Sequence, residues 1–154
     1  MTIEDSIPWT GTPDEFDDLW DSSPWAEEQP GTVPDTLSTM FSQQLKHMQA
    51  YSDLGHTLEP HLWGKLDDRA TQAAIREFAS YTVEELYEAI NHLKNKPWKR
   101  SDQATDVDKF KEELADAWHF FIELHILAGL DPVDVFREYF RKTFVNVHRQ
   151  QTGY

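Results

Sequence analysis

The chain has 154 residues, a length typical of one domain, and its 28 acidic and 14 basic residues give a net charge of −14. This charge argues against binding nucleic acid or an anionic membrane through a basic surface. The absence of cysteine excludes disulfides and thiolate zinc sites. No apolar run is long enough to span a bilayer, and we expect a cytoplasmic protein.

Residues 1–35 differ in composition from the rest of the chain. They hold ten of the acidic residues, none of the basic residues and five of the eight prolines, a composition that predicts no independent fold. Trp9, Trp20 and Trp25 are costly to leave in water, so we expect an extended arm that docks on the domain or on a sister subunit. The alternative is an acidic, aromatic ligand for another protein. The folded domain is then expected over residues 36–154.

Apolar residues recur at helical spacing after this arm and predict an all-α domain. A first helix is expected to begin at Asp35 or Thr36, because either side chain can cap it. Gln43 and Gln44 are expected beside its apolar stripe, where an amide is either an ordinary surface group or a reader of a base edge. The stripe itself comprises Leu37, Met40, Phe41, Leu45, Met48 and Tyr51.

Two further helices are expected in the middle of the chain. One is predicted over about residues 67–96, ended by Pro97 and with a kink or break near Ser80. The other is predicted over about residues 107–128 and ended by Gly129 in the left-handed conformation.

The loop between these two helices is a basic stretch in an acidic chain. Residues 95–100 include Trp98 and Lys99. Their positive charge either compensates the carboxyl end of the preceding helix or contacts a phosphate or a base.

A fourth helix is predicted near the end of the chain, with Asp131 as its cap and Pro132 as its first residue. Three polar side chains, Lys142, Asn146 and Arg149, are spaced to lie on one face of this helix, away from its apolar residues.

The most informative pattern is a pair of acidic clusters on the second and third helices. Glu85 and Glu88 are three residues apart, as are Glu113 and Asp116, so each pair projects two carboxylates from one face at the margin of an apolar stripe. The negative charges of four carboxylates gathered in this way repel one another and need a compensating positive charge. Mg²⁺ can supply it, because it binds carboxylates together with substrate phosphates. Alternatives are surface acids paired with lysines, or a di-iron site, for which only Asp116 and His119 form an approximate match.

The two clusters resemble the Glu-x-x-Glu and Glu-x-x-Asp signature of the all-α nucleoside triphosphate pyrophosphatases, the MazG-like superfamily. The end of the chain is similar to the ending of dimeric dUTPases and phage dCTP/dUTP pyrophosphatases. The resemblance covers about residues 37–154. The matching terminal residues are Lys142, Asn146, Arg149, Gln150, Gly153 and Tyr154.

This resemblance implies a MazG-like bundle of four to five helices and an obligate oligomer, either a homodimer or a dimer of dimers. It implies hydrolysis of a deoxynucleoside triphosphate between the α and β phosphates, in the cytoplasm of a host cell if the protein is encoded by a phage. The cofactor would be Mg²⁺, with Mn²⁺ able to substitute.

The resemblance also implies roles for single residues. The metal would be held by Glu85, Glu88, Glu113 and Asp116. Glu85 would orient the attacking water, and Lys142 and Arg149 would stabilise the departing pyrophosphate. The substrate would be bound by Gln44, Trp98, Lys99, Asn146 and Tyr154.

The sequence departs from the family in the region expected to read the base. Dimeric dUTPases use a Gln and an Asn on the first helix, whereas this chain offers Gln43 or Gln44 without the Asn, and Thr143 replaces an Asn after the motif lysine. We expect dUTP or dCTP as substrate, with a purine nucleotide such as dGTP as the alternative. Two other functions remain open, an acidic DNA mimic that binds basic proteins and a nucleotide sensor without turnover.

Overall fold

The computed structural model describes residues 35–100, 102–139 and 142, which contain helices and no strand. The all-α fold class is therefore confirmed for these residues. Contacts divide the chain into the units Met1–Thr36 and Leu37–Tyr154. None of the described helices combines the length and the apolar character needed to cross a membrane.

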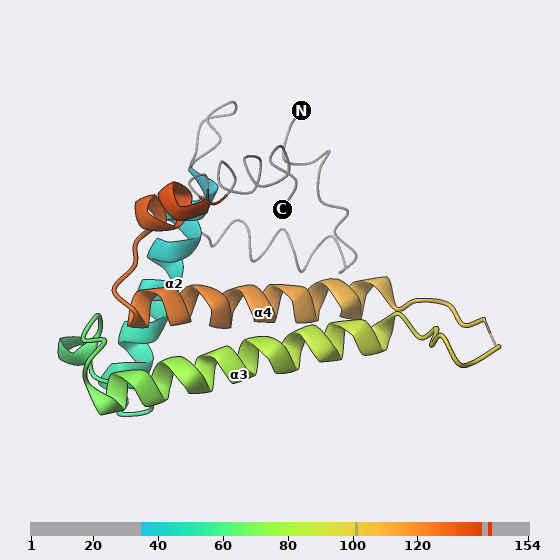
Figure 1. The fold of residues 1–154 in the computed structure, drawn as a ribbon, viewed down its shortest axis with the longest axis horizontal. Helices are drawn as coiled ribbons and strands as arrows, with labels where there is room; N and C mark the ends of the chain where they lie inside the picture. The colour runs from blue at the N-terminus through green and yellow to red at the C-terminus, as the bar shows by residue number, and fades with distance from the viewer. Residues whose placement is uncertain (1–34, 101, 140–141, 143–154) are drawn as a thin grey trace, which may run out of the picture. The chain divides into compact units, whose positions relative to one another are not determined.

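Two long antiparallel helices, α3 (Arg69–His92) and α4 (Val107–Leu127), lie side by side and form the main packing layer (Figure 1). Each begins at an aspartate cap: Asp68 accepts hydrogen bonds from the first turn of α3, and Asp106 accepts one from the first turn of α4. The helix α3 is continuous through Ser80, so the predicted break is wrong.

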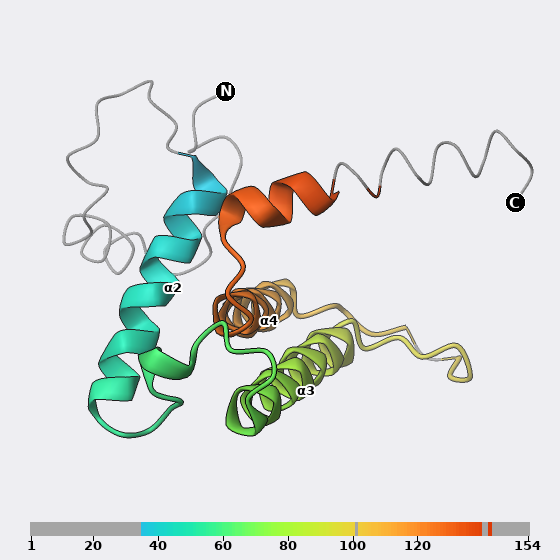
Figure 2. The same ribbon diagram turned by 60° about the vertical axis from the view of Figure 1, so that its left-hand side comes forward.

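The first helix, α2 (Thr36–Asp53), begins at a predicted position and packs against α4 (Figure 2). Its buried side chains are Phe41, Gln44 and Met48, spaced three and four residues apart. The expectation that Gln44 lies beside the apolar stripe is wrong, because its side chain occupies the middle of the buried face. A buried amide needs hydrogen-bond partners, and α4 supplies them.

The end of α3 differs from the prediction. The helix stops at His92, and Lys94 adopts a positive φ of 67°, so the chain turns away before Pro97 is reached. The backbone N–H of Asp106 then donates to the carbonyl of His92 over 3.0 Å. The loop is therefore closed onto the helix end by a tertiary bond that the sequence pattern does not reveal.

The end of α4 follows the prediction closely. Gly129 adopts a φ of 76° directly after the helix, and Gly64, which follows the 3-10 helix η2 (Pro60–Leu62), packs against it. Asp131 then caps a further helical segment over residues 132–139, accepting a hydrogen bond from the N–H of Asp134 over 2.8 Å. The rest of this predicted fourth helix lies outside the described residues, except for Lys142.

Candidate active site

Three carboxylates converge where α3 and α4 run side by side. Oxygen atoms of Glu85 on α3 and of Glu113 and Asp116 on α4 all lie within 4.8 Å of one another. Glu85 and Glu113 are half-buried, whereas Asp116 is exposed. The antiparallel packing of the two helices thus brings together acids that are 28 to 31 positions apart in the sequence.

The negative charges of the carboxylates in this cluster make ionisation of Glu85 less favourable. Burial raises the pKa of Glu85 above its ordinary value, and the neighbouring charges of Asp116, Glu88 and Glu113 raise it further. A divalent cation would reverse this effect, and three carboxylates are hard oxygen donors of the kind that Mg²⁺ and Mn²⁺ prefer. The donor set therefore fits such an ion, with open positions left for water or phosphate oxygens.

Glu88, the fourth expected metal ligand, lies one turn farther along α3 and is exposed. It is not part of the group whose oxygens lie within 4.8 Å, although its charge acts on Glu85. Its role as a ligand stays a prediction.

A histidine supports the acidic cluster from the end of α3. Nε2 of His92 lies 3.4 Å from Oε1 of Glu113, and both side chains are largely buried. Within the described part of the chain, Nδ1 of His92 is buried without a hydrogen-bond partner.

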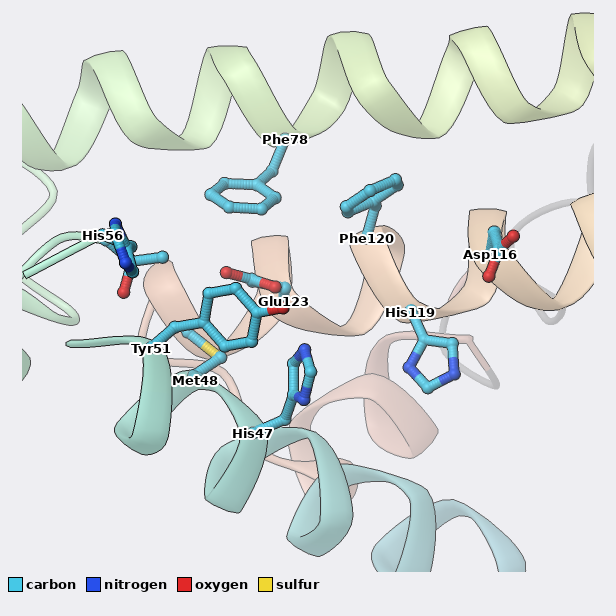
Figure 3. A pocket seen from close by; sticks show the side chains of 10 residues that line it. His47, Met48, Tyr51, His56, Phe78, Asp116, His119, Phe120 and Glu123 are labelled. Carbon is cyan, nitrogen blue, oxygen red and sulfur yellow. The ribbon is translucent and has the colours of Figure 1, made fainter. Parts of the chain in front are cut away.

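The acidic cluster borders a cavity of about 570 Å³ between α2, α3 and α4 (Figure 3). Asp116 belongs both to the cluster and to the wall of this cavity. Aromatic rings form much of the remaining wall, and the Phe78 and Phe120 ring centroids are 5.9 Å apart. The lining comprises His47, Met48, Tyr51, His56, Thr57, Phe78, Asp116, His119, Phe120 and Glu123.

A chain of hydrogen bonds joins two residues of the cavity wall, Glu123 and His119, through Gln44. Nε2 of Gln44 donates to Oε2 of Glu123 over 3.0 Å, and Oε1 of Gln44 lies 2.8 Å from Nδ1 of His119. Burial raises the pKa of Glu123 to about 7, and the hydrogen bond from Gln44 opposes that rise. The cavity wall thus combines the exposed carboxylate of Asp116, aromatic rings and the buried carboxyl group of Glu123.

The other expected catalytic and substrate-binding residues belong to the loop between α3 and α4 and to the last part of the chain. Trp98 and Lys99 are exposed in the loop between α3 and α4, where Nζ of Lys96 lies 5.7 Å from the Trp98 ring centroid. That loop projects beyond the ends of both helices (Figure 1). Lys142 is exposed and helical. Asn146, Arg149 and Tyr154 lie outside the described residues, and the roles of all six stay predictions.

Glu123 and His92 are not among the site residues expected from the sequence. For Glu123 a signal exists, since it is the single acidic residue in the apolar run over residues 120–127 and lies seven positions after Asp116, on the same helix face. For His92 the matching signal is its spacing of seven from Glu85.

Comparison with known proteins supports a relation to nucleotide pyrophosphatases. The chain is similar to a protein named dCTP pyrophosphatase from Enterobacteria phage LZ5, with 28% identity over 98 residues. The match covers 51% of this chain and 57% of the phage protein, so it spans little more than half of that relative's length. No family model matches the chain, and no solved structure matches it.

Proposed function

We propose that this chain is a Mg²⁺-dependent deoxynucleoside triphosphate pyrophosphatase, which hydrolyses the bond between the α and β phosphates. The observation that carries the proposal is the convergence of Glu85, Glu113 and Asp116 within 4.8 Å, with Asp116 also lining an aromatic cavity. The similarity to a phage protein named dCTP pyrophosphatase supports the same reaction class. The products would be a deoxynucleoside monophosphate and pyrophosphate.

A divalent ion bound here would neutralise the triphosphate and lower the pKa of a bound water. Glu85, Glu113 and Asp116 hold this ion in the proposal, with Glu88 as a further ligand. Glu85 also orients the attacking water in line with the α phosphorus. His92 keeps the Glu113 carboxylate in position through the 3.4 Å contact between its Nε2 and Oε1 of Glu113.

The phosphates and the base occupy different ends of the proposed site. Lys142 and Arg149 stabilise the charge on the departing pyrophosphate, with Lys99, Asn146 and Tyr154 as further phosphate or sugar contacts. The base enters the aromatic cavity, since stacking on such rings contributes about 1–3 kcal/mol per base. Pyrimidine nucleotides, dUTP and dCTP, are the proposed substrates, and a purine such as dGTP is the alternative.

The proposed enzyme assembles as a homodimer or a dimer of dimers. An apolar groove between α3 and α4 supports this, because its wall includes Leu86, Trp118 and Phe121, whose side chains are 42%, 50% and 42% exposed. A second copy of the chain would cover this groove. Light scattering on the purified protein tests the assembly, and a monomer at all concentrations would contradict it.

Product analysis in ¹⁸O-labelled water tests the proposed reaction. Each deoxynucleoside triphosphate is incubated with the full chain and Mg²⁺. The products are then separated, and mass spectrometry measures the ¹⁸O content of each. Attack on the α phosphorus places the label in the monophosphate and leaves the pyrophosphate unlabelled. Label in pyrophosphate or orthophosphate, or no turnover of any nucleotide, would contradict the proposal, and a reaction without Mg²⁺ is the control.

A further inference from the structure

The cavity contains a buried carboxyl group that binding a triphosphate does not require. Glu123 is 6% exposed, yet its side chain is part of the cavity wall, together with the rings of Tyr51 and Phe78. Figure 3 shows its carboxyl group between these two rings. Burying a carboxyl group is costly, as its raised pKa of about 7 shows, so its presence among aromatic side chains calls for a function.

The hydrogen bonds around ionised Glu123 determine the orientation of the Gln44 amide group and the tautomer of His119. A carboxylate only accepts hydrogen bonds, so the NH₂ group of Gln44 must face Oε2 of Glu123. The amide oxygen of Gln44 then faces Nδ1 of His119 over 2.8 Å, which assigns the imidazole proton to that nitrogen. With Oε2 engaged by Gln44, Oε1 of Glu123 is the oxygen that can accept a hydrogen bond from a ligand.

The distance between Glu123 and the acidic cluster suits a nucleotide. Asp116 and Glu123 are seven residues apart on α4, which corresponds to about 10 Å along a helix. Both residues contribute to the wall of the same cavity. A nucleoside phosphate whose phosphate lies near Asp116 can therefore extend its base through this cavity toward Glu123, beside the rings that line it.

We propose that Glu123 selects nucleotides whose base carries an exocyclic amino group, cytosine before uracil, by accepting a hydrogen bond from that group. This inference rests on the proposed function, because it takes the cavity as the site of the substrate base. Cytosine and uracil differ at C4, where cytosine has an amino donor and uracil a carbonyl acceptor. When Glu123 is ionised, the uracil oxygen would face the oxygen of Glu123 without a proton between them, and an unmatched buried polar pair strongly disfavours the wrong ligand.

The test compares kcat/KM for dCTP and dUTP in the wild-type chain and in Glu123→Gln at pH 8, above the Glu123 pKa of about 7, so that the carboxyl group is ionised. The wild type is expected to prefer dCTP by about 10- to 100-fold. In the variant, the new amide oxygen accepts from Gln44 and the new NH₂ group faces the cavity, where it can donate to uracil. The preference should therefore fall at least about tenfold. Glu59→Gln is the control, because Glu59 is an exposed acid paired with His61 and is not among the residues that line the cavity. The ratio of kcat/KM values for dCTP and dUTP in this variant should equal that of the wild type.

The possible outcomes separate this inference from the proposed function. If nucleotides are hydrolysed but dUTP is preferred, or if Glu123→Gln leaves the ratio unchanged, the inference is overturned while the enzyme assignment stands. If nothing is hydrolysed, calorimetry with dCMP and dUMP decides the inference. Tighter binding of dCMP that is lost in the variant supports it, and equal binding of the two overturns it.

A second variant covers the case in which Glu123→Gln does not fold. Glu123→Asp keeps the charge but withdraws the oxygen atoms from the cavity by one methylene group. The ratio of the two kcat/KM values should again fall toward one. A ratio unchanged from the wild type in a folded Glu123→Asp chain would overturn the inference.

Discussion

Gln44 and Glu123 are 79 positions apart in the sequence, yet Nε2 of Gln44 donates a 3.0 Å hydrogen bond to Oε2 of Glu123. Both side chains are buried, with exposed fractions of 3% and 6%. The bond joins α2 to α4 at the wall of the cavity. One interaction thus serves both the packing of the first helix and the shape of the proposed base pocket.

Glu123 should make the stability of the fold depend on pH. Its pKa is about 7 in the folded chain, against an ordinary value of 4.5. The folded state therefore binds the proton more tightly, and the contribution of Glu123 to stability is present below about pH 4.5 and is lost as the pH rises through about 7. Because Glu123→Gln is neutral at every pH, it should be more stable than the wild type at pH 8, by about 2 kcal/mol, and equal to it near pH 4.

Urea unfolding of the two chains at a series of pH values measures this difference directly. Taking the difference between the chains cancels the other titrating groups, which both share. A difference that stays constant between pH 4 and pH 8 would show that Glu123 ionises as an ordinary exposed carboxyl group.

Removing the partner of Glu123 should destabilise the fold. Gln44→Ala leaves a buried carboxylate and the Nδ1 of His119 without their hydrogen bonds, which should lower the free energy of unfolding by about 1–3 kcal/mol at pH 8. Gln43→Ala is a matched control on the exposed side of the same helix, and its effect should stay within about 0.5 kcal/mol. Equal effects of the two substitutions in urea unfolding would contradict the buried position of Gln44.

The contact between Gly129 and Gly64 predicts a steric limit at the end of α4. A Cβ atom added at Gly129 would lie 2.8 Å from the Cα of Gly64, and Gly129 also has a φ of 76°. Gly55 has a similar φ of 72° but nothing within 4 Å of an added Cβ. Both Gly→Ala variants therefore carry the cost of a left-handed residue, about 1 kcal/mol, and only Gly129→Ala adds a backbone clash.

Thermal unfolding of the two glycine variants separates these effects. Gly129→Ala should lose about 1–3 kcal/mol more than Gly55→Ala, because the loop and the helix end must move apart. Similar melting temperatures for the two variants would show that Gly64 and Gly129 do not pack closely.

Local signals in the sequence were sufficient to predict most helix boundaries. The starts of α2 at Thr36 and of α4 at Val107 agree with the predicted positions, and Gly129 ends α4 in the left-handed conformation as predicted, because these signals depend only on neighbouring residues. The end of α3 could not be predicted in this way. It is set by the turn at Lys94 and by the bond between the N–H of Asp106 and the carbonyl of His92, which needs the packed pair of helices.

In the candidate site, too, features set by neighbouring residues could be predicted, whereas those set by tertiary packing could not. Helical spacing predicts that Glu113 and Asp116 share a face, but only the packing of α3 on α4 brings Glu85 to them and leaves Glu88 outside the group. The hydrogen-bond partner of Glu123 is Gln44 on α2, which lies about half the chain length away in the sequence. Periodicity alone therefore marks Glu123 as unusual without indicating what it contacts.

The most direct test of the account is the Mg²⁺-dependent release of pyrophosphate from a deoxynucleoside triphosphate by the wild type, Glu113→Gln and Glu112→Gln. Glu112 is an exposed acid on the same helix, paired with Lys109, so both variants remove one negative charge and only one removes a proposed metal ligand. The account predicts that Glu113→Gln lowers the rate at least about 100-fold while Glu112→Gln retains it. Full activity in a folded Glu113→Gln chain would contradict the assignment of the metal site.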